Sequence, residues 1–271
     1  MSVHNEVKRV TTHTLQQMKN KGERISMLTA YDYSFTKIFD EAGIDILLVG
    51  DSASNVIAGH ETTLPITLDQ MIFMASSVVR AAHRCFVVCD MPFGTYQGNS
   101  KEALNSSIRI MKESGAHAVK LEGGVEVCDT ISRIVSSGIP VMAHLGLTPQ
   151  SIYQFGTYSV RAKEEAEAEQ LLKNAYAVQA AGAFSLVLEK IPAALGKRVA
   201  EALNIPVIGI GAGMHVDGQV LVMHDMLGIT KDFSPRFLRR YLNLYDEIKM
   251  ATSQYIKDVK SRDFPNEKEQ Y

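Results

Sequence analysis

Short apolar runs alternate with amphipathic stretches along most of this chain of 271 residues. Runs rich in β-branched residues and bounded by turn signals are typical of buried strands. On this pattern we predict eight strands, at residues 25–30, 46–50, 85–89, 118–121, 140–143, 185–188, 206–209 and 218–223. The eighth is the least distinct, because VLVMHD at 220–225 could equally begin a helix.

Helix signals fill the intervals between these strands. TLDQ at 67–70 and NSKE at 99–102 have the form of capping boxes, which mark helix starts. The helices predicted between strands are 34–42, 67–83, 99–114, 125–137, 164–181 and 191–203. Ser234 before Pro235 predicts a last helix from there towards Tyr255.

Strict alternation of strands and helices, with no linker-like break in composition, favours one (β/α)8 TIM barrel over two doubly wound domains. We assign residues 1–271 to a single α/β barrel domain. Residues 1–24 form an N-terminal helical extension, whose helical pattern at 12–19 is placed to plug the lower mouth of the barrel. Residues 258–271 form a polar C-terminal tail.

Composition narrows the class of function. The chain has 28 basic and 30 acidic side chains without long runs of either sign, which argues against nucleic-acid and membrane partners and favours small-molecule chemistry. The N-terminus lacks the apolar core of a signal peptide and no apolar run is long enough to span a membrane, so we expect a cytoplasmic protein. The three cysteines have no metal-type spacing and are expected to be reduced.

Polar residues stand where the predicted strands end, and in a TIM barrel the reaction site lies at the carboxyl ends of the strands. Five successive strands end this way, with Asp51 and Ser52, Asp90, Lys120 and Glu122, His144, and Glu189. Counting back by twos reaches apolar residues that should face the barrel interior: Leu47 and Val49, Phe86 and Val88, Met142, and Val187.

Four acids converging on one mouth would repel each other, and Lys120 alone does not offset them. A divalent cation is therefore expected. The available ligands are carboxylate oxygens, which favour Mg²⁺ over Zn²⁺. Asp51 and Asp90, on adjacent strands, are the expected direct ligands, with Glu122 binding directly or through water.

Structural roles compete with these interpretations. An acid at a strand end can simply cap the next helix. His144 could be a hydrogen-bonded core histidine, and Lys120 could extend to solvent. The glycine cluster VIGIGAG at 207–213 fits a phosphate-binding loop, but close backbone packing explains it nearly as well.

Several blocks occur in the order found in the ketopantoate hydroxymethyltransferase family, which is related to the phosphoenolpyruvate mutase and isocitrate lyase barrels. The resemblance covers roughly residues 28–228 and rests on LVGDSASNV, DMPFGTYQG, AVKLEGG, IPVMAHLGLTPQS, LVLEKIP, IPVIGIGAG and DGQVLVMHD. The chain departs from the family pattern at Ala143, where glycine is usual, and around 155–161 and 214–215.

The resemblance implies transfer of a one-carbon unit from methylenetetrahydrofolate to 3-methyl-2-oxobutanoate in pantothenate biosynthesis, with Mg²⁺ at the strand ends and assembly into a homodecamer. It also implies roles for individual residues. Asp51 and Asp90 would bind the metal with Glu122 near it. Asp51, Ser52, Asp90 and Lys120 would hold the oxo acid. Glu189 would accept the proton, and we add His144 to the residues that contact the substrate or hold a carboxylate.

Two other functions stay open at this stage. A related Mg²⁺-dependent lyase or mutase acting on a small 2-oxo acid would grip its substrate in the same way, but such enzymes often use a loop cysteine, and the loops here offer only Cys128. A non-catalytic, metal-holding binding module would show no exchange of the C3 proton of the oxo acid with solvent.

Overall fold

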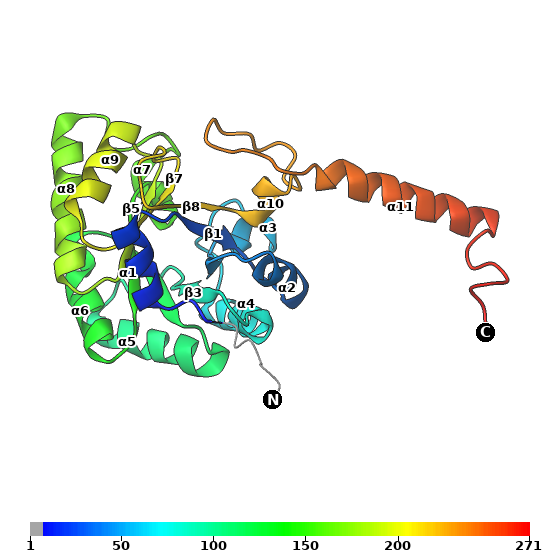
Figure 1. The fold of residues 1–271 in the computed structure, drawn as a ribbon, viewed down its shortest axis with the longest axis horizontal. Helices are drawn as coiled ribbons and strands as arrows, with labels where there is room; N and C mark the ends of the chain where they lie inside the picture. Colours follow the sequence, from blue (N-terminus) through cyan, green and yellow to red (C-terminus); the bar gives the residue numbers. More distant parts are fainter. Residues whose placement is uncertain (1–7) are drawn as a thin grey trace. The chain divides into compact units, whose positions relative to one another are not determined.

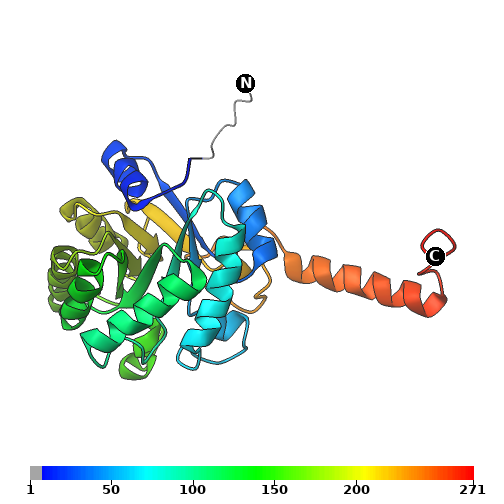
Figure 2. The same ribbon diagram turned by 90° about the horizontal axis from the view of Figure 1, so that it is seen from below.

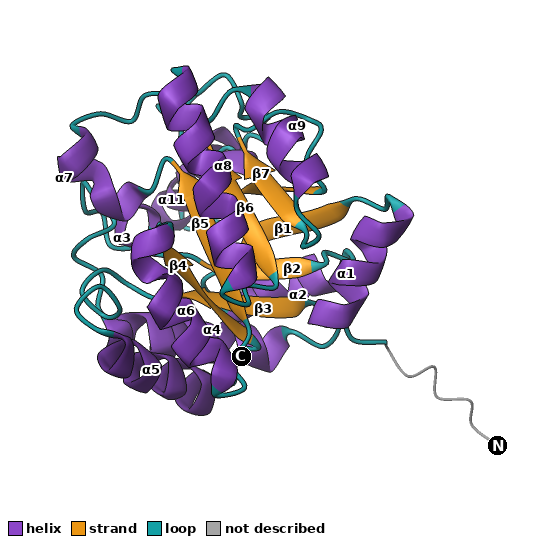
Figure 3. Cartoon of the chain, turned by 90° about the vertical axis from the view of Figure 1, so that its left-hand side faces the viewer, coloured by secondary structure: helices purple, strands orange, loops and turns teal. Residues whose placement is uncertain are grey.

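The computed structural model describes residues 8–271, so residues 1–7 of the predicted N-terminal extension lie outside it. Eight parallel strands close into a barrel in sequence order, with β8 paired to β1. Figure 3 shows the strands enclosed by helices. The strands are β1 (Ile25–Thr29), β2 (Ile46–Val49), β3 (Phe86–Asp90), β4 (Ala118–Glu122), β5 (Val141–Gly146), β6 (Ser185–Glu189), β7 (Val207–Ile210) and β8 (Gly218–Leu221). The predicted TIM barrel and all eight strands are confirmed.

Helices surround the ring of strands (Figures 1 and 2). They are α2 (Tyr33–Glu41), α3 (Ala53–Val56), α4 (Leu68–Ala81), α5 (Ser100–Arg109), α6 (Cys128–Ser136), α7 (Ile152–Phe155), α8 (Glu165–Ala180) and α9 (Ala193–Ala202). The six helices predicted between strands are all present. Thr67 and Gln70 form the expected capping box at the start of α4, and the Asn99 side chain caps α5, which continues as a π-helical turn over Ile110–Ser114.

Alternate residues of the strands fill the barrel interior, as parallel strands with two covered faces require. The interior residues are Ile25, Met27, Ile46, Leu48, Phe86, Val88, Ala118, Met142, Val187, Ile208 and Val220. The predicted inward rows of β3, β5 and β6 are therefore correct. The β2 row is wrong by one residue, because Ile46 and Leu48 face inward and Leu47 and Val49 face the helices.

Helix α1 (Thr12–Lys21) supplies the predicted plug. The Thr11 side chain caps it, and Gly22 ends it in the left-handed conformation, with φ of 72°. Leu15 has no exposed surface and packs with Val10 against the interior residues of the barrel. The N-terminal segment thus closes the core at one end of the barrel.

Replacing Leu15 with alanine should destabilise the protein by about 2–5 kcal/mol, because it removes buried methyl groups and leaves a cavity at the end of the core. Denaturant unfolding measures the loss, with Gln17→Ala on the exposed face of the same helix as the control. A Leu15→Ala protein as stable as the control would mean that α1 does not complete the core.

Asp40 connects the end of α2 to the start of β3. Its carboxylate accepts hydrogen bonds from the backbone N–H groups of His83, Arg84 and Cys85, at 2.8 to 3.2 Å. Burial alone would raise the pKa of Asp40, but these hydrogen bonds outweigh it and lower the pKa.

Asp40→Asn should therefore destabilise the protein by about 1.5–3 kcal/mol near neutral pH, as expected for hydrogen bonds to a charged group. Because the pKa of the folded state is lowered, this stabilisation is present above the unfolded-state pKa, near 3.9, and is lost as the pH falls through the folded-state value. Unfolding curves at pH 7 and at pH 3 test this. The Asp40→Asn deficit should shrink at low pH, whereas exposed Asp69→Asn should show no such deficit.

The chain divides into two compact units, Met1–Val222, which holds the barrel, and Met223–Tyr271. The assignment of residues 1–271 to one domain stays a prediction. In the second unit, α10 (Met223–Met226) follows β8 directly, so the ambiguous segment 220–225 contributes to both a strand and a helix.

The predicted start of the last helix is wrong, and the polar C-terminal tail stays a prediction. Helix α11 runs over Leu244–Ser261, so it begins nine residues after Pro235 and extends into the segment expected to be tail. The Arg240 guanidinium explains the late start, because it donates hydrogen bonds to the carbonyls of Thr230, Lys231 and Phe233 and so holds this segment as an irregular loop.

Cys85, Cys89 and Cys128 are free thiols, as predicted. Across residues 8–271, the structure contains no helix with the length and apolar character needed to cross a lipid bilayer.

Candidate active site

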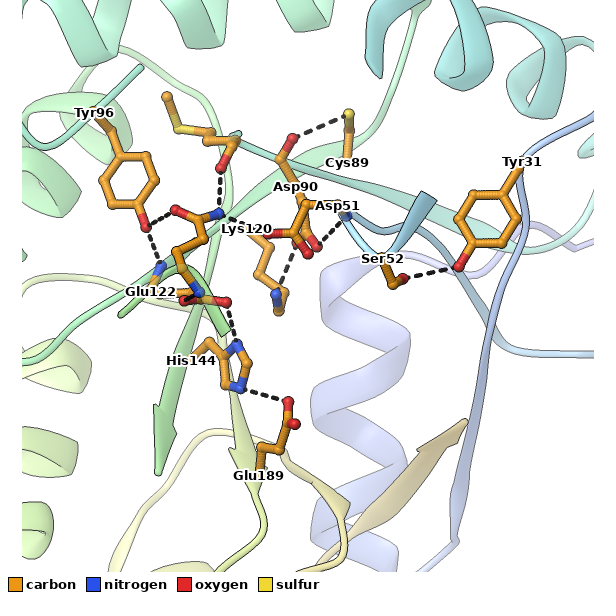
Figure 4. A network of polar contacts seen from close by, with 12 residues as sticks. Tyr31, Asp51, Ser52, Cys89, Asp90, Tyr96, Lys120, Glu122, His144 and Glu189 are labelled. Atoms are coloured by element: carbon orange, nitrogen blue, oxygen red, sulfur yellow. Dashed lines mark hydrogen bonds and ion pairs between the residues drawn. The ribbon is translucent and has the colours of Figure 1, made fainter. Parts of the chain in front are cut away.

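The carboxyl ends of β3 to β6 bring five of the predicted residues together (Figure 4). The strand register explains this, since Asp90 is paired with Lys120 and Glu122 with His144. Glu189 ends β6, the next strand. Side chains two residues apart share a face, so Lys120 and Glu122 both point into the mouth.

Asp51 joins this group from the turn after β2 rather than from the strand's inward row. Its backbone N–H donates to Oδ2 of Asp90 at 3.0 Å. A Cβ atom on Gly50 would lie 2.9 Å from Oγ of Ser52 and 3.6 Å from Oδ2 of Asp90, so glycine lets the turn approach the site closely. Ser52 reaches the same region, and its Oγ lies 2.9 Å from the hydroxyl of Tyr31.

Lys120 and Asp90 form an ion pair with almost no exposed surface, at 2.8 Å between Nζ and Oδ1. Burial would lower the pKa of Lys120, but the charges of Asp90, Glu122 and Asp51 outweigh it and raise the pKa. Lys120 is therefore a fixed positive charge, and the alternative in which it extends to solvent is wrong.

Asp51 lies in surroundings that disfavour its ionised form. Burial raises the pKa of Asp51 to about 8, and repulsion by Asp90 and Glu122 acts in the same direction. Lys120 and a hydrogen bond from Gln150 oppose this rise without cancelling it. A cation bound at Asp51 would relieve this repulsion.

His144 lies between two carboxylates. Its Nδ1 is 3.3 Å from Oε1 of Glu122 and its Nε2 is 3.3 Å from Oε2 of Glu189. Both contacts fall short of hydrogen-bond geometry, so the pairing is electrostatic. Burial and Lys120 would lower the pKa of His144, but the two carboxylates raise it to about 9. His144 is therefore a charged bridge at neutral pH rather than a hydrogen-bonded core histidine.

Gly146 and Gly213 test whether the glycines near the site serve close packing or ligand binding. Gly146 has φ of 95°, and a Cβ there would lie 2.3 Å from the carbonyl oxygen of Glu189, so glycine allows β5 and β6 to meet at the base of the site. In the glycine cluster after β7, a Cβ on Gly213 would lie 2.5 Å from Cβ of Ala193. Close packing therefore explains the glycine at position 213, so this residue does not by itself indicate a phosphate-binding loop.

Sequence reasoning missed two residues of the site, Tyr96 and Gln150. The Gln150 side chain donates to Oδ2 of Asp51 at 2.9 Å, and its backbone N–H donates to Oε2 of Glu122 at 2.9 Å. The hydroxyl of Tyr96 donates to Oε1 of Gln150 at 2.7 Å and accepts from the backbone N–H of Glu122. Both residues lie in blocks that carry the family resemblance, which is the one sequence signal that pointed to them.

The donor set fits a hard divalent cation. Within residues 8–271, no group of three or more histidine, cysteine, aspartate or glutamate side chains is placed so that it could hold a metal ion by itself. Mg²⁺ does not need one, since it commonly takes one or two carboxylates and completes its coordination with water or substrate oxygens. Asp51, with its unrelieved repulsion, and the adjacent Asp90 provide this kind of site.

Comparison of the whole fold with solved structures finds the same barrel in enzymes of low sequence identity. Phosphonopyruvate hydrolase, solved with oxalate and Mg²⁺, aligns with a TM-score of 0.60 at 11% identity, covering 96% of this chain and 93% of that one. 2,3-Dimethylmalate lyase, a member of the PEP mutase/isocitrate lyase superfamily, aligns with a TM-score of 0.59 at 15% identity, covering 94% and 89%. At such identities the likeness concerns the fold alone.

Sequence comparison is more specific. The family model for ketopantoate hydroxymethyltransferase matches residues 9–267. The 3-methyl-2-oxobutanoate hydroxymethyltransferases of Flavobacterium johnsoniae and Cytophaga hutchinsonii are 68% and 66% identical to this chain over 266 residues, with 98% of each chain covered. The chain therefore belongs to the ketopantoate hydroxymethyltransferase family, whose reaction is the transfer of a hydroxymethyl group to 3-methyl-2-oxobutanoate.

Proposed function

We propose that this chain transfers the one-carbon unit of methylenetetrahydrofolate to 3-methyl-2-oxobutanoate at the mouth of the barrel, with Mg²⁺ bound there, to give ketopantoate for pantothenate biosynthesis. The observation that carries this proposal is the buried cluster of Asp51, Asp90, Lys120 and Glu122 facing Glu189 across His144 (Figure 4). The part of this cluster with Asp51, Asp90 and Lys120 has the charges to bind a metal and an oxo acid. Glu189 supplies a carboxylate that can accept a proton.

Asp51 and Asp90 would hold the Mg²⁺ ion. Glu122 already contacts Gln150 through Oε2 and His144 through Oε1, so its contribution is better met through a water molecule than by direct binding. When bound, Mg²⁺ would stabilise negative charge on the ketone oxygen of the substrate as a Lewis acid, a contribution of several kcal/mol.

Lys120 and Ser52 would bind the substrate carboxylate. Lys120 offers a positive charge at the mouth, and Ser52 offers a hydroxyl that lies 2.9 Å from the hydroxyl of Tyr31. This grip orients the oxo acid so that its C3 carbon faces β6. A fixed orientation of this kind lowers the barrier by removing motions that the free substrate would have to lose.

Glu189 would remove the C3 proton. Its side chain is about one-fifth exposed, at 19%, so it is more accessible than the metal-side carboxylates while still shielded from bulk water. Its Oε2 lies 3.3 Å from Nε2 of His144, a contact that would help to orient the carboxylate towards the substrate. Hydrolysis of methylenetetrahydrofolate would consume one water, break its methylene–nitrogen bonds and release tetrahydrofolate and the one-carbon unit as formaldehyde. The enolate carbon would then bond to the formaldehyde carbon, and the formaldehyde oxygen would take up the proton held by Glu189 to become the hydroxyl of ketopantoate.

We also propose the homodecameric assembly and the cytoplasmic location that the sequence suggested. Helix α11 supports self-association, because it has no buried residue within the described chain and presents Tyr245, Ile248, Met250, Tyr255, Ile256 and Val259 as exposed apolar side chains. Surfaces of this kind are common at protein–protein contacts.

Consumption of 3-methyl-2-oxobutanoate by the purified protein tests the proposal. The oxo acid should disappear and ketopantoate should form only when both methylenetetrahydrofolate and Mg²⁺ are present. Cleavage of a 2-oxo acid without folate would instead support the lyase or mutase alternative. No turnover and no C3 proton exchange would support a non-catalytic binding module.

A further inference from the structure

Gln150 uses the whole hydrogen-bonding capacity of its side-chain amide. Nε2 donates to Oδ2 of Asp51 at 2.9 Å and to the carbonyl oxygen of Met91 at 3.0 Å. Oε1 accepts from the hydroxyl of Tyr96 at 2.7 Å and from Nε2 of Gln97 at 3.0 Å. An amide has two donor hydrogens and two acceptor lone pairs, so every position is filled.

These partners allow only one orientation of the amide. On the Nε2 side, the Met91 carbonyl oxygen can only accept a hydrogen bond. On the opposite side, the Gln97 amide nitrogen can only donate. A flipped amide would place its oxygen against the Met91 carbonyl oxygen and its NH₂ against another NH₂, which is unfavourable on both sides.

We propose that Gln150 is the positioning residue for Asp51, fixing its carboxylate in the place where the metal and the oxo acid bind. This inference rests on the proposed role of Asp51 as a metal ligand. Asp51 lies in a turn rather than in a strand, so the barrel itself does not hold its side chain. Gln150 comes from the 3₁₀ turn Pro149–Ser151 after β5 and is itself buried.

The contacts of Gln150 separate its side-chain role from its backbone role. Its backbone N–H binds Glu122, and that contact survives any substitution except proline. Side-chain variants therefore test the link to Asp51 while the link to Glu122 is kept. Residues that orient a metal ligand without touching the metal typically contribute 10- to 100-fold in affinity.

Gln150→Met keeps the approximate length of the side chain and removes its hydrogen bonds. We expect the dissociation constant for Mg²⁺ in the presence of 3-methyl-2-oxobutanoate, measured by calorimetry on the full chain, to rise by about 10- to 100-fold. C3 proton exchange should fall at low Mg²⁺ and recover at saturating Mg²⁺.

Gln150→Glu is expected to weaken Mg²⁺ binding, because it retains the shape but replaces the donor NH₂ with an oxygen that faces Asp51 and the Met91 carbonyl. Gln170→Met is the matched control. It makes the same change at an exposed glutamine of α8 whose amide donates to Asn174, and its Mg²⁺ affinity should stay within about threefold of wild type, well below the 10- to 100-fold range.

The possible results distinguish the proposed function from the proposed role of Gln150. Wild-type protein that binds no Mg²⁺ with the oxo acid would refute the proposed function. Wild-type binding together with unchanged affinity in Gln150→Met would overturn the role of Gln150 alone. If Gln150→Met fails to fold by circular dichroism, Gln150→Asn carries the test, because it keeps an amide but is one methylene too short to reach Asp51. Wild-type affinity in that variant would equally overturn the inference.

Discussion

Glu189→Gln should lower the exchange of the C3 proton of 3-methyl-2-oxobutanoate with deuterated solvent by about 10²- to 10⁴-fold, the range expected for loss of a general base. Glutamine keeps the size of the side chain but cannot accept the proton. Binding of the oxo acid and of Mg²⁺ should persist, because Asp51, Asp90 and Lys120 are unchanged and their contacts do not involve Glu189.

Proton NMR of the oxo acid measures this exchange directly, and calorimetry measures binding in the same preparation. Glu201→Gln, a charge-removing change on the exposed face of α9, serves as the control and should exchange like wild type. Exchange at the wild-type rate in Glu189→Gln would remove Glu189 from the role of proton acceptor.

Asp51→Asn and Asp90→Asn should each weaken Mg²⁺ and oxo-acid binding together. We expect a loss of about 100-fold or more for each direct ligand removed, since loss of an indirect contact already reaches 10- to 100-fold.

The two variants should differ in the stability of the metal-free protein. Asp90 is paired with Lys120 and accepts the N–H of Asp51, so Asp90→Asn should cost about 1.5–3 kcal/mol. Asp51 is repelled by its neighbours, so Asp51→Asn should cost nothing or stabilise the protein.

Unfolding in the presence of a chelator tests the stability difference, and calorimetry tests the binding. Retention of wild-type Mg²⁺ affinity in both variants would exclude this pair as the metal site. A larger stability loss for Asp51→Asn than for Asp90→Asn would contradict the charge distribution described here.

The barrel could be predicted from the sequence because each parallel strand is covered on both faces and therefore appears as a nearly continuous apolar run. The ionisable residues of the site could be predicted for a related reason. Asp90, Lys120, His144 and Glu189 lie at or near the carboxyl ends of strands, and the topology alone brings those ends together.

Features that depend on turns and tertiary hydrogen bonds could not be predicted in this way. The inward face of β2 was wrong by one residue because Asp51 reaches the site through the turn after Gly50, not by strand alternation. The start of the last helix was wrong because Arg240 binds three carbonyls of the preceding loop. Gln150 has its role only through partners on other loops, which no local pattern encodes.

The central claim is that Asp51 and Asp90 together hold one divalent cation at the mouth of the barrel. Diffraction from crystals grown with 3-methyl-2-oxobutanoate and Mn²⁺ in place of Mg²⁺ would test it most directly, because the anomalous signal locates the metal. We predict one Mn²⁺ peak in contact with both carboxylates and with the oxo acid. A peak at other residues, or none at this site with the oxo acid bound, would contradict the account.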